Sequence, residues 1–268
     1  MINNLWVQNS DGALCGARCA GTTGDAIVFV HGVGSTAAIW DYQLSYLSKR
    51  YQCYAVELRG NGRGSVEPPS AAITREGYVE DVVAVADAVG AKRFHFIGCS
   101  LGAVVGFELW KHSPERVRSF IFIGAFAAYP DGERTAKAIA AEVLATGDMR
   151  AFAQARAKRV FQDQQATRRY EETIEQMACK NVDSYLAATR ATWTGDFRGM
   201  LHTVSVPTLV MCGEHDQIAP LPLSREIAVG IPGAQLEVIA GANHVANADR
   251  PTELNDLIER FLRSVTVN

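Results

Sequence analysis

Short apolar runs alternate with segments of helical periodicity along most of this chain. A helical stretch runs from Tyr78 to Val89, and Gly90 stands where a C-terminal cap is expected. Each of the short apolar runs is apolar enough to be a strand that is buried on both faces. The alternation predicts the α/β fold class, with a mostly parallel central sheet that is covered by helices on both faces. The first four runs are "AIVFV" (26–30), "CYAVEL" (53–58), "RFHFIG" (93–98) and "VRSFIFIG" (117–124).

The alternation is interrupted once, and the interruption predicts the domain organisation. From about residue 132 to 192 the chain carries only helix-like stretches that are rich in Ala, Arg and Glu. Strand-like runs return at 207–213 and 235–241, and a helix follows from Pro251. We therefore expect a core of residues 1–124 and 204–268, with a helical cap of residues 125–203 inserted over one end of the sheet. The first twenty residues are expected to form a hairpin that turns at "NSDG" (9–12).

Composition narrows the function classes. The 268 residues suit one large domain, and 26 basic against 29 acidic side chains give a net charge of −3. This balance predicts neither nucleic acid nor an anionic membrane as a partner, and a homo-oligomer is compatible with it. The first residues lack a secretion-signal pattern, so a cytoplasmic location is expected. The six cysteines have no zinc-like spacing, and we expect reduced thiols with no disulfide, metal or cofactor.

One strand-like run ends in the segment "FIGCSLGA" (96–103), in which Ser100 lies between Gly98 and Gly102. A strand, a sharp turn and a helix around G-x-S-x-G form the nucleophile elbow that exposes a reactive serine. The serine then lies at a helix N-terminus, where the helix dipole favours developing negative charge. An ordinary N-cap serine between two loop glycines gives the same pattern. The rest of the chain therefore has to supply the other catalytic groups.

A nucleophilic serine needs a base and an orienting acid, and two later loops offer them. Asp216 in "GEHDQIAP" and His244 in "GANHVAN" each follow a strand-like run, at the edge of the sheet that presents Ser100. The order Ser, Asp, His along the chain is typical of one hydrolase fold. Glu214 is the alternative acid.

The tetrahedral intermediate of acyl transfer also needs hydrogen-bond donors for its oxyanion. "HGVGS" (31–35) follows a strand-like run directly, and its glycines allow backbone N–H groups to turn toward the site. We predict that the N–H groups of Val33 and Leu101 form the oxyanion hole. His31 is interpreted as a structural hydrogen-bonding residue rather than the base.

Five motifs occur in an order that resembles the α/β-hydrolase superfamily: "HGVGS", "LRGNGRGS", "GCSLGA", "GEHDQIAP" and "GANHVANADRP". Among its branches, the chain is most similar to 3-oxoadipate enol-lactonases and related hydrolases of small esters. The resemblance implies that Ser100 is the nucleophile, Asp216 the acid and His244 the base, with the oxyanion hole at Val33 and Leu101. Three positions depart from the usual motifs, namely Asn61, Cys99 and Ala103.

The predicted function is hydrolysis of a small carboxylic ester or lactone through an acyl-enzyme, without metal or cofactor. Hydrolysis of a C–C bond in a diketone-type acid uses the same triad and remains an alternative. A signalling receptor for a small ligand, with slow turnover, is a second alternative. "GNGRGS" (60–65) is not a dinucleotide loop, since G-x-G-x-x-G needs glycine at position 65.

The predicted cap carries further candidate side chains. Arg156, Lys158 and Arg159 form a basic cluster that can meet a substrate carboxylate, although a solvated helix face is the preferred interpretation. Met177 and Trp193 are candidates for the pocket wall, but an amphipathic helix buries such residues in any case.

Overall fold

The computed structural model of the protein describes residues 1–8, 12, 14–61, 69–162 and 168–266. These residues form one eight-stranded sheet in the order β1-β2-β4-β3-β5-β6-β7-β8. The strands are β1 (Asn3–Gln8), β2 (Leu14–Ala20), β3 (Ala26–Val30), β4 (Gln52–Glu57), β5 (Phe94–Cys99), β6 (Val117–Ile123), β7 (Thr208–Gly213) and β8 (Gln235–Ile239). The α-helices are α1 (Asp41–Leu47), α2 (Arg75–Ala88), α3 (Leu101–His112), α4 (Gly132–Thr146), α5 (Met149–Val160), α6 (Arg168–Ala178), α7 (Val182–Trp193), α8 (Leu221–Gly230), α9 (Ala246–Asp249) and α10 (Pro251–Thr266). Short 3-10 helices are η1 (Ala37–Trp40), η2 (Ser70–Ala72), η3 (Pro114–Arg116) and η4 (Arg198–Thr203).

The sheet is mostly parallel, as predicted. Strands β4, β3, β5, β6, β7 and β8 pair in parallel, whereas β1 and β2 join the edge next to β4 in antiparallel pairs. The predicted N-terminal hairpin is confirmed, with Gln8 opposite Leu14, and residues 9–11 of its turn lie outside the described residues. Because all six parallel strands run in one direction, the loops that follow them meet at one edge of the sheet.

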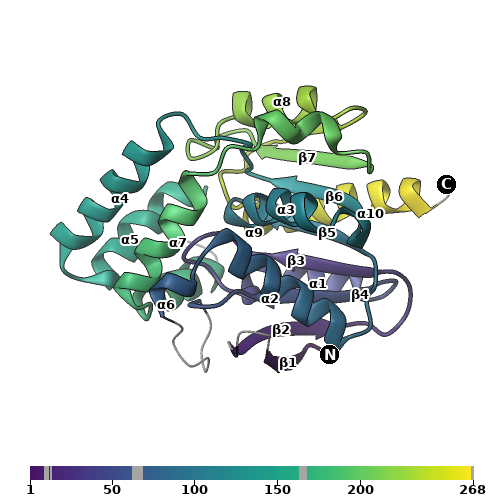
Figure 1. Ribbon diagram of the computed structural model, residues 1–268, viewed down its shortest axis with the longest axis horizontal. Helices are drawn as coiled ribbons and strands as arrows, with labels where there is room; N and C mark the ends of the chain where they lie inside the picture. The colour runs from purple at the N-terminus through teal and green to yellow at the C-terminus, as the bar shows by residue number, and fades with distance from the viewer. Residues whose placement is uncertain (9–11, 13, 62–68, 163–167, 267–268) are drawn as a thin grey trace.

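Apolar burial explains why the central strands form. Every residue of β3 and β5 is buried, because helices cover both faces of the sheet (Figure 1). Helix α2 begins where the Thr74 side chain accepts a hydrogen bond from the Gly77 backbone N–H at 3.0 Å. The predicted cap at Gly90 is also present, since its φ of +71° is the left-handed conformation that glycine tolerates after a helix.

Helices α4 to α7 gather together beside the sheet, at the left of Figure 1, and they account for most of the segment 125–203. The two ends of that segment lie side by side. The Phe197 backbone N–H donates to the Ala127 carbonyl at 2.8 Å, and Ala128 bridges to Asp196. An inserted segment whose entry and exit pair in this way can be accommodated without breaking the strand order of the sheet.

Two α-helices, α8 and α9, were not predicted. Helix α8 buries only Ser224 and Ile227, so its sequence carries no strong apolar stripe. Helix α9 has four residues, too few for a helical period to be recognised. Among the helices of the described residues, none combines the length and the apolar character that a membrane crossing needs.

Candidate active site

Ser100 lies at the sharp bend between β5 and α3. Its backbone has φ 54° and ψ −113°, a conformation that L-residues rarely adopt. The Ser100 N–H donates to the Ile123 carbonyl of the neighbouring strand at 3.0 Å, which holds the bend against β6. A strained residue of this kind persists only where the surrounding structure fixes it, and such residues cluster at functional sites.

The two glycines of G-x-S-x-G are required by close backbone approach. A Cβ atom at Gly98 would collide with the backbone of Gly102, and one at Gly102 would collide with the Val30 carbonyl. Strand β5, helix α3 and strand β3 are therefore in direct backbone contact beneath the serine. The glycines serve the elbow, and a loose loop would not need them.

His244 and Asp216 meet across the loops that follow β8 and β7. The His244 Nδ1 atom lies 2.9 Å from Asp216 Oδ2, and both residues are 5% exposed. The other carboxylate oxygen accepts backbone N–H bonds from Ile218 at 2.9 Å and Ala219 at 2.8 Å. A carboxylate can only accept here, so Nδ1 carries a proton, and in the neutral imidazole the lone pair is then on Nε2.

The alternative acid, Glu214, lies elsewhere. Its side chain is about half exposed and accepts the Gly241 backbone N–H at 2.9 Å. The structure therefore brings Asp216, and not Glu214, to the imidazole of His244.

Ser100 and His244 line one narrow cavity. Its volume is about 40 Å³, room for about three water molecules. The loop after β3 forms another wall, since a Cβ atom at Gly32 would lie only 3.4 Å from Ser100 Cβ. The cavity lining comprises Gly32, Val33, Ser35, Ile39, Cys99, Ser100, Arg156, Val160, Thr173, Met177, His244 and Val245.

Two backbone donors lie beside the serine. Val33 lines the cavity, and Leu101 is the first residue of α3, directly after Ser100. Within the described residues, the N–H groups of Val33 and Leu101 donate to no acceptor. Free N–H groups next to a reactive oxygen are suited to stabilise an oxyanion.

His31 holds the loop that carries Val33. It is fully buried, its Nδ1 donates to the Gly32 carbonyl at 2.9 Å, and its Nε2 accepts the Leu58 N–H at 3.3 Å. Both ring nitrogens are thus used in backbone contacts, which supports the structural role predicted for His31.

The predicted basic cluster divides between two environments. Arg159 is exposed and pairs with Glu142 at 3.0 Å, and Lys158 is exposed too. The predicted solvent-exposed helix face is therefore confirmed for these two residues. The same prediction is wrong for Arg156, which is 7% exposed and lines the cavity. The sequence signal was its spacing, because Arg156 lies four residues from both Phe152 and Val160 and shares their buried face.

The two apolar candidates in the segment 125–203, Met177 and Trp193, lie in different places. Met177 lines the cavity. Trp193 does not, and its ring stacks on Phe126 with centroids 5.3 Å apart and contacts Tyr129. Trp193 therefore helps to join the start and the end of the segment 125–203 and is not part of the cavity lining.

Cys99, next to the serine, is a buried thiol. Burial raises its pKa to about 12, and the nearby Asp216 charge adds to the shift. A thiol with this pKa is protonated at neutral pH and is a poor nucleophile. The described residues contain no group of three or more His, Cys, Asp or Glu side chains arranged to hold a metal ion.

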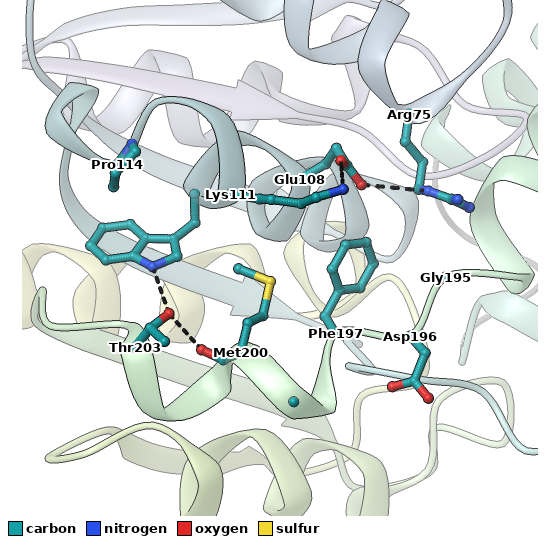
Figure 2. Close-up of a pocket in the computed structure, with 11 residues that line it drawn as sticks. Arg75, Glu108, Lys111, Pro114, Gly195, Asp196, Phe197, Met200 and Thr203 are labelled. Carbon is teal, nitrogen blue, oxygen red and sulfur yellow. Dashed lines mark hydrogen bonds and ion pairs between the residues drawn. The ribbon is translucent and has the colours of Figure 1, made fainter.

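A second pocket lies at the opposite end of α3 (Figure 2). Its buried acid, Glu108, accepts a hydrogen bond from Lys111 at 3.0 Å and lies 3.6 Å from Arg75. Trp110 donates to the Thr203 hydroxyl at 3.2 Å, as Figure 2 also shows. Glu108 lies eight residues from Ser100 along α3, roughly 12 Å along the helix axis. Glu108 and Trp110 are thus engaged in hydrogen bonds, and the described residues of this pocket present no nucleophile with a base.

A match to a known protein family covers the loops that form this site. A family model described as alpha/beta hydrolase fold matches residues 25–251, which include the serine, acid and histidine loops. This chain belongs to the α/β-hydrolase fold family.

Relatives in the α/β-hydrolase family cover nearly the whole chain. The chain is 25% identical to 3-oxoadipate enol-lactonase 1 of Acinetobacter baylyi, over 98% of each sequence. A crystal structure of a hydrolase from Pseudomonas aeruginosa PA01 superposes with a TM-score of 0.89 at 28% identity, covering 97% of this chain and 98% of that one. The enol-lactonase from Burkholderia xenovorans LB400 shares the fold, with a TM-score of 0.88 at 24% identity over 97% of this chain and all of that one. These similarities support a hydrolase of the ester or lactone type.

Proposed function

We propose that this protein is a serine hydrolase that cleaves a small carboxylic ester or lactone through an acyl-enzyme. The observation that carries the proposal is the shared cavity, in which the strained Ser100 and the Asp216-bound His244 are both present. This arrangement supports Ser100 as the nucleophile, His244 as the base and Asp216 as the orienting acid.

In the first half of the proposed reaction, Ser100 Oγ attacks the substrate carbonyl carbon while His244 Nε2 takes the hydroxyl proton. The negative charge that develops on the carbonyl oxygen is stabilised by the N–H groups of Val33 and Leu101 and by the N-terminus of α3. Asp216 stabilises the imidazolium, and the two backbone N–H bonds to its Oδ1 fix the carboxylate in place.

In the second half, His244 gives its proton to the leaving oxygen as the C–O bond breaks. In a lactone the leaving oxygen stays attached to the acyl group. Water then attacks the acyl-enzyme, His244 accepts a proton from it, and Ser100 Oγ leaves with that proton as the acid is released.

The substrate class is proposed from size and from the relatives. The cavity is small, so a compact acyl group fits best, and a larger one requires lining side chains to move. We propose that residues 125–203 form a cap over the site, because α5 and α6 supply Arg156, Val160, Thr173 and Met177 to the lining. The name of the Acinetobacter baylyi relative adds enol-lactones to the compounds worth testing.

Steady-state hydrolysis tests the proposal. Short-chain methyl esters, enol-lactones and a diketone-type acid would be offered to the wild type, to Ser100→Ala and to Ser113→Ala, a control at the other end of α3. We expect turnover of an ester or lactone that falls by about 10⁴-fold or more in Ser100→Ala and persists in Ser113→Ala. Wild-type rates in Ser100→Ala would refute the mechanism. Faster cleavage of the diketone would favour the C–C alternative, and ligand-induced stabilisation without product would favour a receptor.

A further inference from the structure

Arg156 is a buried cation that forms no ion pair with any residue that the structure describes. Its side chain comes from α5 into the cavity that holds Ser100 and His244, and the residue is 7% exposed. Within the described residues, its guanidinium has no hydrogen-bond acceptor and no acidic partner. Arg159, three residues along the same helix, forms two hydrogen bonds to Glu142 at 3.0 and 3.3 Å.

Among the residues that the structure describes, none beside Arg156 supplies a negative charge. The remaining described residues of the cavity lining include no carboxylate. Tyr129 and Tyr185 lie near enough for the Arg156 charge to act on them, but burial raises the pKa of both hydroxyls above the ordinary value, so they stay neutral. Burying a charge without a partner is costly, and proteins rarely do so unless a ligand supplies the opposite charge.

Resting on the proposed function, we propose that Arg156 binds a carboxylate that the substrate carries in addition to its scissile carbonyl. The favoured substrates are then half-esters of short dicarboxylic acids, or lactones with a carboxylate arm. The guanidinium suits this role because its planar fork donates two parallel hydrogen bonds to a carboxylate. Arg156 thus sets substrate specificity, while Ser100 and His244 carry out the chemistry.

A matched pair of substrates measures this selectivity. Monomethyl succinate and methyl butyrate have similar length and the same leaving group, and only the first carries a carboxylate. The wild type should prefer monomethyl succinate, measured as the ratio of the two kcat/KM values. In Arg156→Gln that ratio should fall by about 10- to 100-fold, mainly through KM for the charged ester. Arg156→Lys should retain part of the preference, and Arg159→Gln should leave it unchanged.

Two results would overturn the role of Arg156. One is a wild type that shows no preference for the charged ester. The other is an Arg156→Gln variant in which both esters lose activity equally while the melting temperature falls, which indicates a structural role.

Ligand binding separates this inference from the proposed function. Calorimetric titration of Ser100→Ala with monomethyl succinate requires no turnover, and adding Arg156→Gln should raise Kd about tenfold or more. If neither ester is hydrolysed but this difference appears, the hydrolase proposal fails and the carboxylate site stands. If hydrolysis of methyl butyrate is normal and the two Kd values are equal, only the carboxylate site fails.

Discussion

Replacing Asp216 with Asn changes the chemistry of His244 while leaving the shape of the site intact. The Oδ1 atom of Asp216 accepts two backbone N–H bonds, at 2.9 and 2.8 Å, so the carbonyl oxygen of an Asn side chain is held in that position. The amide NH₂ group then faces His244 Nδ1, where Oδ2 now lies at 2.9 Å. Two donors cannot share this contact, so His244 is forced into the tautomer that carries its proton on Nε2.

The expected loss follows from that tautomer. A protonated Nε2 cannot accept the Ser100 proton, and the imidazolium also loses the stabilising charge of the carboxylate. The corresponding change in a serine protease triad lowers kcat by about 10⁴-fold, and we expect a loss of similar size here. The fold should persist, because the two backbone hydrogen bonds are kept.

The assay is steady-state ester hydrolysis together with a thermal melt of each variant. Glu214→Gln is the matched control, since the Glu214 side chain is exposed and accepts the Gly241 N–H. It lies 3.8 Å from His215 and, within the described residues, forms no hydrogen bond to His244. We expect near wild-type rates for this control. A loss of less than about tenfold in Asp216→Asn, or loss of activity in Glu214→Gln, would refute the assignment of the acid.

Three further predictions concern the elbow, the core and the neighbouring thiol. Gly102→Ala should destabilise the protein by several kcal/mol, because the added Cβ would collide with the Val30 carbonyl. The control Gly199→Ala, whose added Cβ would contact nothing, should change the denaturation midpoint little. His95 is buried, and burial lowers its pKa from 6.5 to about 4, so the unfolded state takes up the proton first. The free energy of unfolding should therefore not depend on His95 above pH 6.5 and should fall by up to about 3 kcal/mol as the pH drops to 4. In pH-dependent melts, His95→Asn should reduce this loss. Cys99, with its pKa raised to about 12, should resist iodoacetamide at pH 7, and rapid inactivation that Cys99→Ala prevents would contradict its burial.

The parallel sheet and the loops that carry Ser100, Asp216 and His244 are predictable from the sequence, because each depends on local chemistry. Apolar runs that are buried on both faces mark the strands, and the carboxyl ends of parallel strands share one edge. The role of Gly98 and Gly102 is predictable from the sequence, because only glycine allows the close backbone contacts of the elbow.

The side-chain contacts of the segment 125–203 were harder to predict, because they are set by tertiary packing. The sequence of α5 shows Arg156 among other cations. In the structure Arg156 is buried on the face of α5 that lines the cavity, whereas Arg159 is exposed and pairs with Glu142. Helix α8 has few buried residues, so its sequence shows only a weak helical periodicity of apolar residues. Whether a charged side chain meets solvent or a cavity depends on which helix face is covered, and that is decided by residues far away in the chain.

Labelling with a fluorophosphonate probe tests most directly whether the hydroxyl of Ser100 is an activated nucleophile. After digestion, mass spectrometry should locate a single adduct on the peptide that contains Ser100, and His244→Ala should slow its formation by several powers of ten. An adduct that forms at an unchanged rate in Ser100→Ala, or a labelling rate that does not depend on His244, would contradict the proposed mechanism.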